Sequence, residues 1–165
     1  MKIKTDIDIF SFNYPYHKKL KQSTLKFLEN YPDVQDKKTN VKEKMTEWNI
    51  SSPQIEELKE FILSNVNFLY PYTVNYQMNI HDFWANIYEK EDYAIDHAHL
   101  PYSFSFVYFL SCKNNHPPLI FTFSKKRINP VEGSIVLFPS ILKHHVPKNK
   151  LTEKRIVLAG NIKVD

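Results

Sequence analysis

Beyond Tyr70-Pro71 the chain divides into short β-type segments, and this property limits its fold more than any other. Nearly every segment is rich in aromatic or β-branched residues and is bounded by proline, asparagine or charged pairs. We expect strands at 73–81, 83–89, 93–99, 103–112, 118–124, 134–138, 143–147 and 154–163. Short strands in such a succession predict an antiparallel sandwich or jelly roll, a mainly β fold.

Glycine is scarce, with only two in 165 residues, so the turns must depend mainly on proline and asparagine. The segment 114–118, Asn-Asn-His-Pro-Pro, is an example. Gly133 is informative for the same reason, because it closes Asn-Pro-Val-Glu-Gly directly before a strongly apolar segment. We expect a tight turn there that leads into a buried strand.

The N-terminal part of the chain has a different, partly helical pattern. We expect a strand near a sheet edge at 3–12, a helix at 17–30 and a polar, lysine-rich loop at 37–47. A clearer helix follows, with Ser52 as its N-cap, Pro53 at its first position and helical spacing through Asn65. Its apolar stripe predicts that it lies on the outside of a sheet.

Length and composition favour one domain over residues 1–165, in which 1–70 supply a strand and supporting helices and 71–165 form the core jelly roll. The content of 42% hydrophobic and 15% aromatic residues is sufficient for a core rich in Phe and Tyr. The formal net charge of +4 comes from scattered lysines, so we expect no nucleic-acid partner. Oligomeric state is left open.

The remaining global features concern compartment. A single cysteine, Cys112, excludes an intramolecular disulfide and any Cys-x-x-Cys motif. The first residues lack an apolar signal core, and no segment approaches the roughly 20 apolar residues that span a bilayer. We therefore expect a cytoplasmic protein without a membrane partner.

Histidines provide the strongest chemical signal. His97 and His99 are separated by one residue, so on a strand their imidazoles point to the same face. A third histidine from a distant strand would complete one facet of a mononuclear metal site, and His144 and His145 are both candidates because spacing alone does not choose between them. The alternative is a pair of histidines hydrogen-bonded to solvent or backbone at a strand end.

Arg155 is the second chemical signal, because it is the one charge in the apolar run Arg-Ile-Val-Leu-Ala. A guanidinium that faces a sandwich interior needs a partner, and it matches a carboxylate in a bidentate manner. Arg155 could therefore hold an anionic co-substrate, unless it lies at the exposed start of its strand beside Lys154. Arg127, within Lys-Lys-Arg, is expected in a solvated turn.

Four segments, taken together in this order, resemble a known family. They are Trp84-Ala-Asn86, the His97-Ala-His99 segment that runs to Leu110, Pro130 to His144 with its Phe-Pro-Ser, and Arg155 to Asn161. The family is that of the iron(II)- and 2-oxoglutarate-dependent oxygenases, specifically a small prokaryotic and phage-associated branch of the prolyl-hydroxylase-like type. The resemblance covers about residues 84 to 161.

This resemblance implies a double-stranded β-helix, a cupin-like jelly roll, with N-terminal helices packed on one sheet. It implies Fe(II), 2-oxoglutarate and O2 as cofactors, and a dioxygenase that couples oxidative decarboxylation of 2-oxoglutarate to hydroxylation of a substrate. It makes His97, His99 and His144 the iron ligands, which selects His144 over His145. Arg155 would hold the distal carboxylate of 2-oxoglutarate, and Asn86 and Tyr88 would line the pocket.

Four positions differ from the family's pattern. Most relatives outside the branch have an acidic residue where His99 stands, Phe109 replaces a tyrosine, Val157 replaces a serine, and Phe106 replaces a glycine and would add bulk next to the site. Two alternatives to the oxygenase therefore stay open: a cupin-like three-histidine metal enzyme that does not use 2-oxoglutarate, and a catalytically inactive binding module. The substrate, a small molecule or a peptide, is not defined by the sequence.

Overall fold

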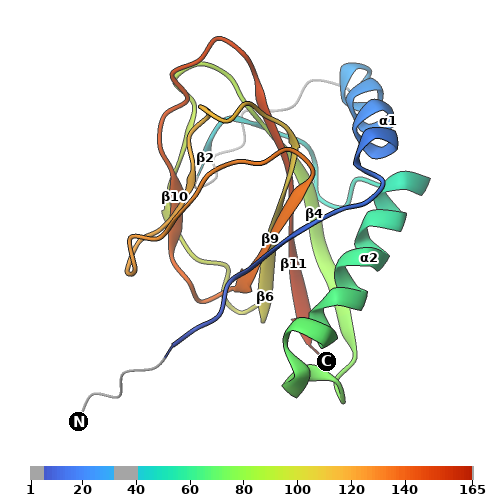
Figure 1. Cartoon of the computed structure of the whole chain (residues 1–165). Helices are drawn as coiled ribbons and strands as arrows, with labels where there is room; N and C mark the ends of the chain where they lie inside the picture. The colour runs from blue at the N-terminus through green and yellow to red at the C-terminus, as the bar shows by residue number, and fades with distance from the viewer. Residues whose placement is uncertain (1–5, 32–40, 165) are drawn as a thin grey trace.

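A computed structural model describes residues 6–31 and 41–164, whose strands form two facing sheets (Figure 1). The larger sheet has the order β1-β9-β6-β11-β4-β3 and the smaller has the order β2-β5-β10-β7-β8. Every strand pair among the described residues is antiparallel, as predicted. The strands are β1 (Phe10–Asn13), β2 (Val41–Lys42), β3 (Lys44–Met45), β4 (Met78–Tyr88), β5 (Tyr93–His97), β6 (Phe104–Ser111), β7 (Leu119–Phe121), β8 (Arg127–Ile128), β9 (Ser134–Pro139), β10 (His144–Val146) and β11 (Arg155–Val164).

Two helices, α1 (His17–Glu29) and α2 (Pro53–Leu69), cover the outer face of the larger sheet (Figure 1), and a short 3-10 turn, η1 (Pro71–Thr73), follows α2. The predicted N-cap of α2 is confirmed, since the Ser52 hydroxyl accepts a hydrogen bond from the Ile55 amide at 3.2 Å. Of the residues whose spacing predicts an apolar stripe, Ile55, Leu58 and Ile62 are fully buried, whereas Phe61 and Asn65 are only partly buried. Val66 completes the buried face of α2.

The larger sheet therefore separates two apolar layers, and β6 shows the division. Phe104, Phe106 and Tyr108 belong to the cluster under the helices, whereas Phe109 belongs to the cluster between the sheets. This alternation is the period of two that a strand imposes on its side chains. Both faces of β6 are buried, so its sequence is a nearly continuous apolar run.

Three predictions for residues 3–89 were wrong in their boundaries, and the strand expected at 118–124 is the shorter β7. The strand expected at 3–12 is β1, which begins at Phe10; residues 1–5 lie outside the described residues. The strands expected at 73–81 and 83–89 are the single strand β4. It continues through the polar residues His81 and Asp82, where its pairing with β11 has an irregular register between Asn161 and Ile162. Such a bulge bends a strand without ending it.

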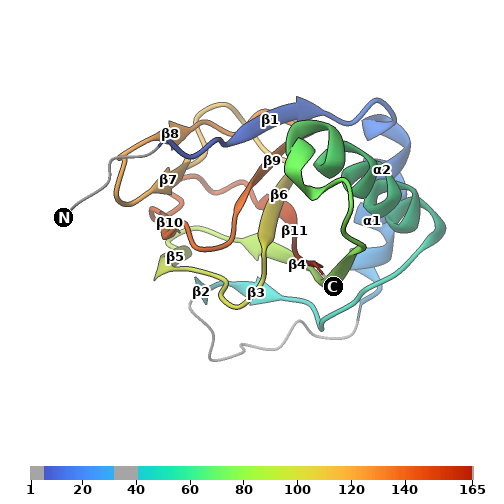
Figure 2. The same ribbon diagram turned by 90° about the horizontal axis from the view of Figure 1, so that it is seen from below.

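The third error concerns the loop expected at 37–47, of which residues 37–40 lie outside the described residues. Residues 41–45, which we call the crossover segment, pair first with β5 and then with β4. One short stretch of chain thus joins the edge of the smaller sheet to the edge of the larger sheet (Figure 2). The segment closes one side of the space between the sheets.

Gly133 adopts a φ of +86° in the turn before β9, a conformation that favours glycine, so the predicted tight turn is confirmed. Among the described residues, neither helix has the length and apolar character needed to cross a membrane.

Candidate metal and anion site

Two of the predicted histidines meet as a cross-strand pair. His97 ends β5 and His144 begins β10, and the two residues lie directly opposite each other in the smaller sheet. Directly opposed residues of an antiparallel pair point to the same face. Their imidazole centroids are accordingly 4.5 Å apart.

The strand predicted at 93–99 ends at His97, so the expectation that His99 lies on it was wrong, and His99 joins this pair from the loop that follows β5. Its amide donates a hydrogen bond to the Ser140 carbonyl at 2.9 Å, which fixes the loop against the end of β9. Its ring centroid lies 4.9 Å from that of His97 and 5.2 Å from that of His144. One nitrogen from each of the three imidazoles lies within 4.8 Å of the other two, a separation that a single ion can bridge.

The hydrogen bonds of two of these rings define their protonation. Nδ1 of His97 is 2.7 Å from the Ile95 carbonyl and Nδ1 of His144 is 2.9 Å from the Leu142 carbonyl. A carbonyl oxygen only accepts, so each Nδ1 carries the hydrogen and donates it, and each Nε2 keeps a free lone pair. Backbone carbonyls that orient imidazoles in this way are typical of metal-binding histidines.

Burial keeps all three imidazoles neutral. It lowers the pKa of His99 to about 3 and that of His144 to about 4, and the neighbouring imidazoles lower both values further. Burial also lowers the pKa of His97. Neutral imidazole is the form that binds a metal, so the donor set fits a divalent transition metal at neutral pH.

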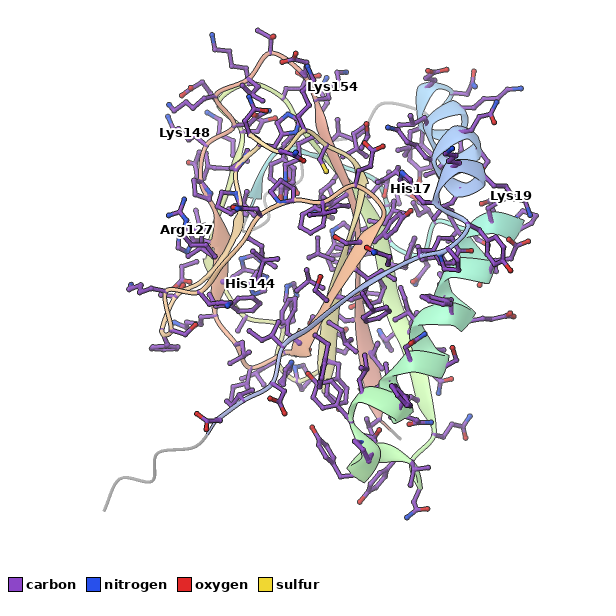
Figure 3. The ribbon with its side chains drawn as sticks, viewed as in Figure 1. His17, Lys19, Arg127, His144, Lys148 and Lys154 are labelled. Carbon is purple, nitrogen blue, oxygen red and sulfur yellow. The ribbon has the colours of Figure 1, made fainter. Side chains whose placement is uncertain are left out.

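His145 does not join the cluster. As the next residue on β10 it faces the other side of the strand, where its Nδ1 lies 3.3 Å from the Thr122 hydroxyl. His144 instead extends from β10 toward the space between the sheets (Figure 3). The geometry thus brings together the three histidines that the family resemblance selects, with His144 in place of His145.

The histidine cluster borders a cavity of about 420 Å³ between the sheets. The larger sheet forms the opposite wall, in rows of residues that pair across its strands. One row is Tyr88 opposite Arg155, and the next is Met45, Asn86, Val157 and Phe109. Asn86 and Tyr88 therefore share a face on β4, as predicted, and both line the cavity.

Arg155 is the most unusual residue of this wall. Its side chain is 1% exposed, and none of its three guanidinium nitrogens has a hydrogen-bond partner among the described residues. The guanidinium instead lies 4.7 Å from the ring centroid of Tyr88 and 5.4 Å from that of Phe109. A fixed, desolvated guanidinium that borders a cavity fits a ligand carboxylate. Arg127, by contrast, is exposed as expected, but it lies on β8 and not in a turn, and its side chain extends outward from the smaller sheet (Figure 3).

The positions that differ from the family's pattern can now be placed. Phe109 lies beside Arg155, and Val157 lies next to it in the sheet. Phe106 is among the residues that line the cavity, but its ring packs beside Phe83 in the layer under the helices, so most of its bulk lies outside the site. Gly160 lies opposite Phe106 and makes room for it: a Cβ there would be 2.6 Å from Phe106 Cζ.

Sequence reasoning missed the contribution of the crossover segment and the residues after it. Met45 and Trp48 line the cavity, and Trp48 packs edge-on against Trp84 at a centroid distance of 4.7 Å. Glu43 is only 3% exposed and lies beside Tyr88. The local sequence Lys-Glu-Lys-Met-Thr-Glu resembles a solvated loop, so only the backbone pairing reveals these roles.

Fold and site together define a class: a double-stranded β-helix with a histidine triad on one wall of its central cavity and a buried arginine on the other. A family model described as "Putative 2OG-Fe(II) oxygenase" matches residues 113–161. This match includes His144 and Arg155, and it confirms the resemblance predicted from the sequence. No curated protein matches the chain.

Several solved structures share the fold at low sequence identity. The viral collagen prolyl hydroxylase vCPH from Paramecium Bursaria Chlorella virus-1, in its 2OG complex, has 12% identity and a TM-score of 0.71 over 93% of this chain and 94% of that chain. A Trichoplax adhaerens prolyl hydroxylase with a peptide fragment of hypoxia inducible factor has 14% identity and a TM-score of 0.73 over 94% and 83%. HygX from Streptomyces hygroscopicus, with nickel and 2-oxoglutarate, has 10% identity and a TM-score of 0.71 over 95% and 83%. These likenesses confirm the double-stranded β-helix.

Proposed function

We propose that this protein is an Fe(II)- and 2-oxoglutarate-dependent dioxygenase that hydroxylates its substrate. One observation carries the proposal: a single cavity has three neutral imidazoles on one wall, two of them oriented by backbone carbonyls, and on the other wall a buried guanidinium without a hydrogen-bond partner among the described residues. A 2-oxo acid with a second carboxylate fits both walls: its 2-oxo acid end could bind a metal held by the histidines, and its second carboxylate could bind Arg155.

The roles of the residues follow from their placement. His97 and His144 would bind iron through the nitrogens left free by their backbone hydrogen bonds, and His99 would supply the third nitrogen. Arg155 would bind the distal carboxylate of 2-oxoglutarate, and Asn86 and Tyr88 would line the pocket of the co-substrate. Bound iron with 2-oxoglutarate and O2 supplies the chemistry that couples decarboxylation of the co-substrate, to succinate and CO2, to hydroxylation of a C–H bond.

The residues around the histidines have a second task, which is to exclude water. Phe121 and Phe138 pack against His144 at centroid distances of 6.1 and 4.9 Å, and Trp84 lies 6.1 Å from His99. A dry aromatic shell strengthens the electrostatic interaction with the guanidinium and limits side reactions of reactive oxygen species. The substrate would approach over Trp48, which is partly exposed, and it is either a small molecule or a peptide.

Binding of 2-oxoglutarate tests the proposal without a known substrate. Calorimetric titration in the presence of Mn(II) should show binding to the wild type and to Arg127→Met, because Arg127 is the exposed arginine of the chain. Arg155→Met should lose at least about 100-fold in affinity, since a bidentate charge-assisted contact contributes about 3 kcal/mol. Iron-loaded wild type should also form succinate slowly from 2-oxoglutarate.

Two results would contradict the proposal: no affinity of the wild type for 2-oxoglutarate, or the same affinity in Arg155→Met. Metal binding without 2-oxoglutarate binding would instead favour the three-histidine enzyme that uses no 2-oxo acid, a donor set that zinc also accepts. If neither metal nor 2-oxoglutarate binds, the inactive binding module is favoured.

A further inference from the structure

A carboxyl group lies directly behind the proposed co-substrate site. Lys44 pairs with Ile87 in the antiparallel β3–β4 ladder, so the preceding residue of the crossover segment, Glu43, falls opposite Tyr88. Tyr88 in turn lies opposite Arg155 in the β4–β11 ladder. Residues opposite one another share a face, so Glu43, Tyr88 and Arg155 form one row across three neighbouring segments.

The side chains of this row are all buried and close together. Glu43 is 3% exposed, Tyr88 is 3% exposed and Arg155 is 1% exposed. The Tyr88 hydroxyl approaches both the Glu43 carboxyl and the Arg155 guanidinium. Nevertheless, neither carboxyl oxygen of Glu43 has a hydrogen-bond partner of good geometry among the described residues.

Burial of a carboxylate beside Arg155 costs desolvation free energy. The carboxylate would also compete for the guanidinium with any anion that binds there. We propose that Glu43 is a positioning residue for the co-substrate: as a neutral acid it supports Tyr88 beside Arg155, and as a carboxylate it takes the guanidinium away from 2-oxoglutarate. The inference rests on the proposed function and adds a dependence on pH to it.

The surroundings of Glu43 determine the pH at which its carboxyl group ionises. Among the described residues, the groups that act on Glu43 are Tyr88 of β4, Arg155 of β11 and Asp92 of the turn after β4. Burial raises the pKa of Glu43 to about 8, since it outweighs the opposing effects of the Tyr88 hydroxyl and the guanidinium. At pH 7 about nine molecules in ten therefore carry the neutral acid, and at pH 9 about nine in ten carry the carboxylate.

The ionisation of Glu43 predicts a loss of affinity for 2-oxoglutarate as the pH rises. If 2-oxoglutarate binds only the form with neutral Glu43, its Kd should rise by about tenfold between pH 7 and pH 9, and about one proton should be taken up per molecule bound at pH 9. Burial raises the pKa of Tyr88 well above its ordinary value, so the phenol does not titrate in this window.

The test is calorimetric titration of 2-oxoglutarate into Mn(II)-loaded protein at pH 7 and pH 9, in buffers of different ionisation enthalpy. Glu43→Gln keeps the shape but has no proton to lose, so it should bind equally at both pH values with almost no proton uptake. Glu47→Gln, an exposed glutamate just past the crossover segment, is the matched control and should keep the wild-type tenfold change.

The possible outcomes separate the two proposals. No binding by the wild type at pH 7 would refute the oxygenase. Binding by the wild type without proton uptake at pH 9, or a Glu43→Gln variant that retains the tenfold change, would refute the role of Glu43 and leave the oxygenase intact. The measurement of proton uptake needs only the wild type, so it decides even if the variant does not fold.

Discussion

Replacement of Arg155 by methionine should stabilise the metal-free protein while it abolishes co-substrate binding. The guanidinium is 1% exposed and its nitrogens have no hydrogen-bond partner among the described residues, and an uncompensated buried charge costs several kcal/mol. Contacts with the rings of Tyr88 and Phe109 return about 0.5–2 kcal/mol each. Methionine fills a similar path with an apolar, adaptable chain. The balance favours the variant by about 1–3 kcal/mol.

Urea denaturation at pH 7, followed by circular dichroism in metal-free buffer, measures this difference as a shift in midpoint at constant slope. Addition of Mn(II) and 2-oxoglutarate at about 100 times Kd should then stabilise the wild type by about 2.7 kcal/mol more than the metal alone does, and should leave the variant unchanged. A metal-free variant that is less stable than the wild type by more than about 1 kcal/mol, with the same slope, would refute the view of Arg155 as an unsatisfied charge.

Three further predictions concern other parts of the molecule. His144→Ala should lower metal affinity by more than about 100-fold in a competition assay with a chelator, whereas His145→Ala should keep the metal, and equal losses would contradict the proposed ligand set. Gly160→Ala places a methyl group 2.6 Å from Phe106 Cζ and should lower the free energy of unfolding by about 1–3 kcal/mol, so an unchanged urea midpoint would show that the neighbours yield. Because the pKa of Glu43 is about 8 when folded and near 4.5 when unfolded, the folded state binds more protons and its stability should fall by about 1.4 kcal/mol per pH unit across this range. The fall in unfolding free energy from pH 5 to pH 7 should be correspondingly smaller in Glu43→Gln, and parallel curves for the two proteins would count against the raised pKa.

The sequence predicts the strands best where one physical signal dominates. The short apolar segments of β6 and β9 and the turn at Gly133 are local features, and their prediction was confirmed. The break expected near residue 82 was wrong, because a polar pair ordinarily ends a strand, whereas the partner strand β11 here absorbs it through an irregular register. Pairing of that kind depends on a strand about 80 residues away, so no local pattern reports it.

In the candidate site, too, some residues could be predicted from the sequence and others could not. The period of two predicts that His97 and His99 share a strand face, but β5 ends at His97 and His99 reaches the cluster from the following loop. The resemblance supplies His144 and Arg155. Glu43 could not be found from the sequence, because charged residues on both sides make it look like part of a solvated loop. Its burial follows from the pairing of the crossover segment with β4, a tertiary contact.

The two walls of the cavity belong to different sheets, and this has a mechanical consequence. His97 and His144 are part of the smaller sheet, whereas Arg155 is part of the larger one. A ligand bound to both the histidines and Arg155 would link the two sheets across the cavity, in addition to the link that the crossover segment makes at one edge. Amide hydrogens of β10 and β11 would then exchange with solvent more slowly as a unit, and separation of the layers would become a rarer fluctuation.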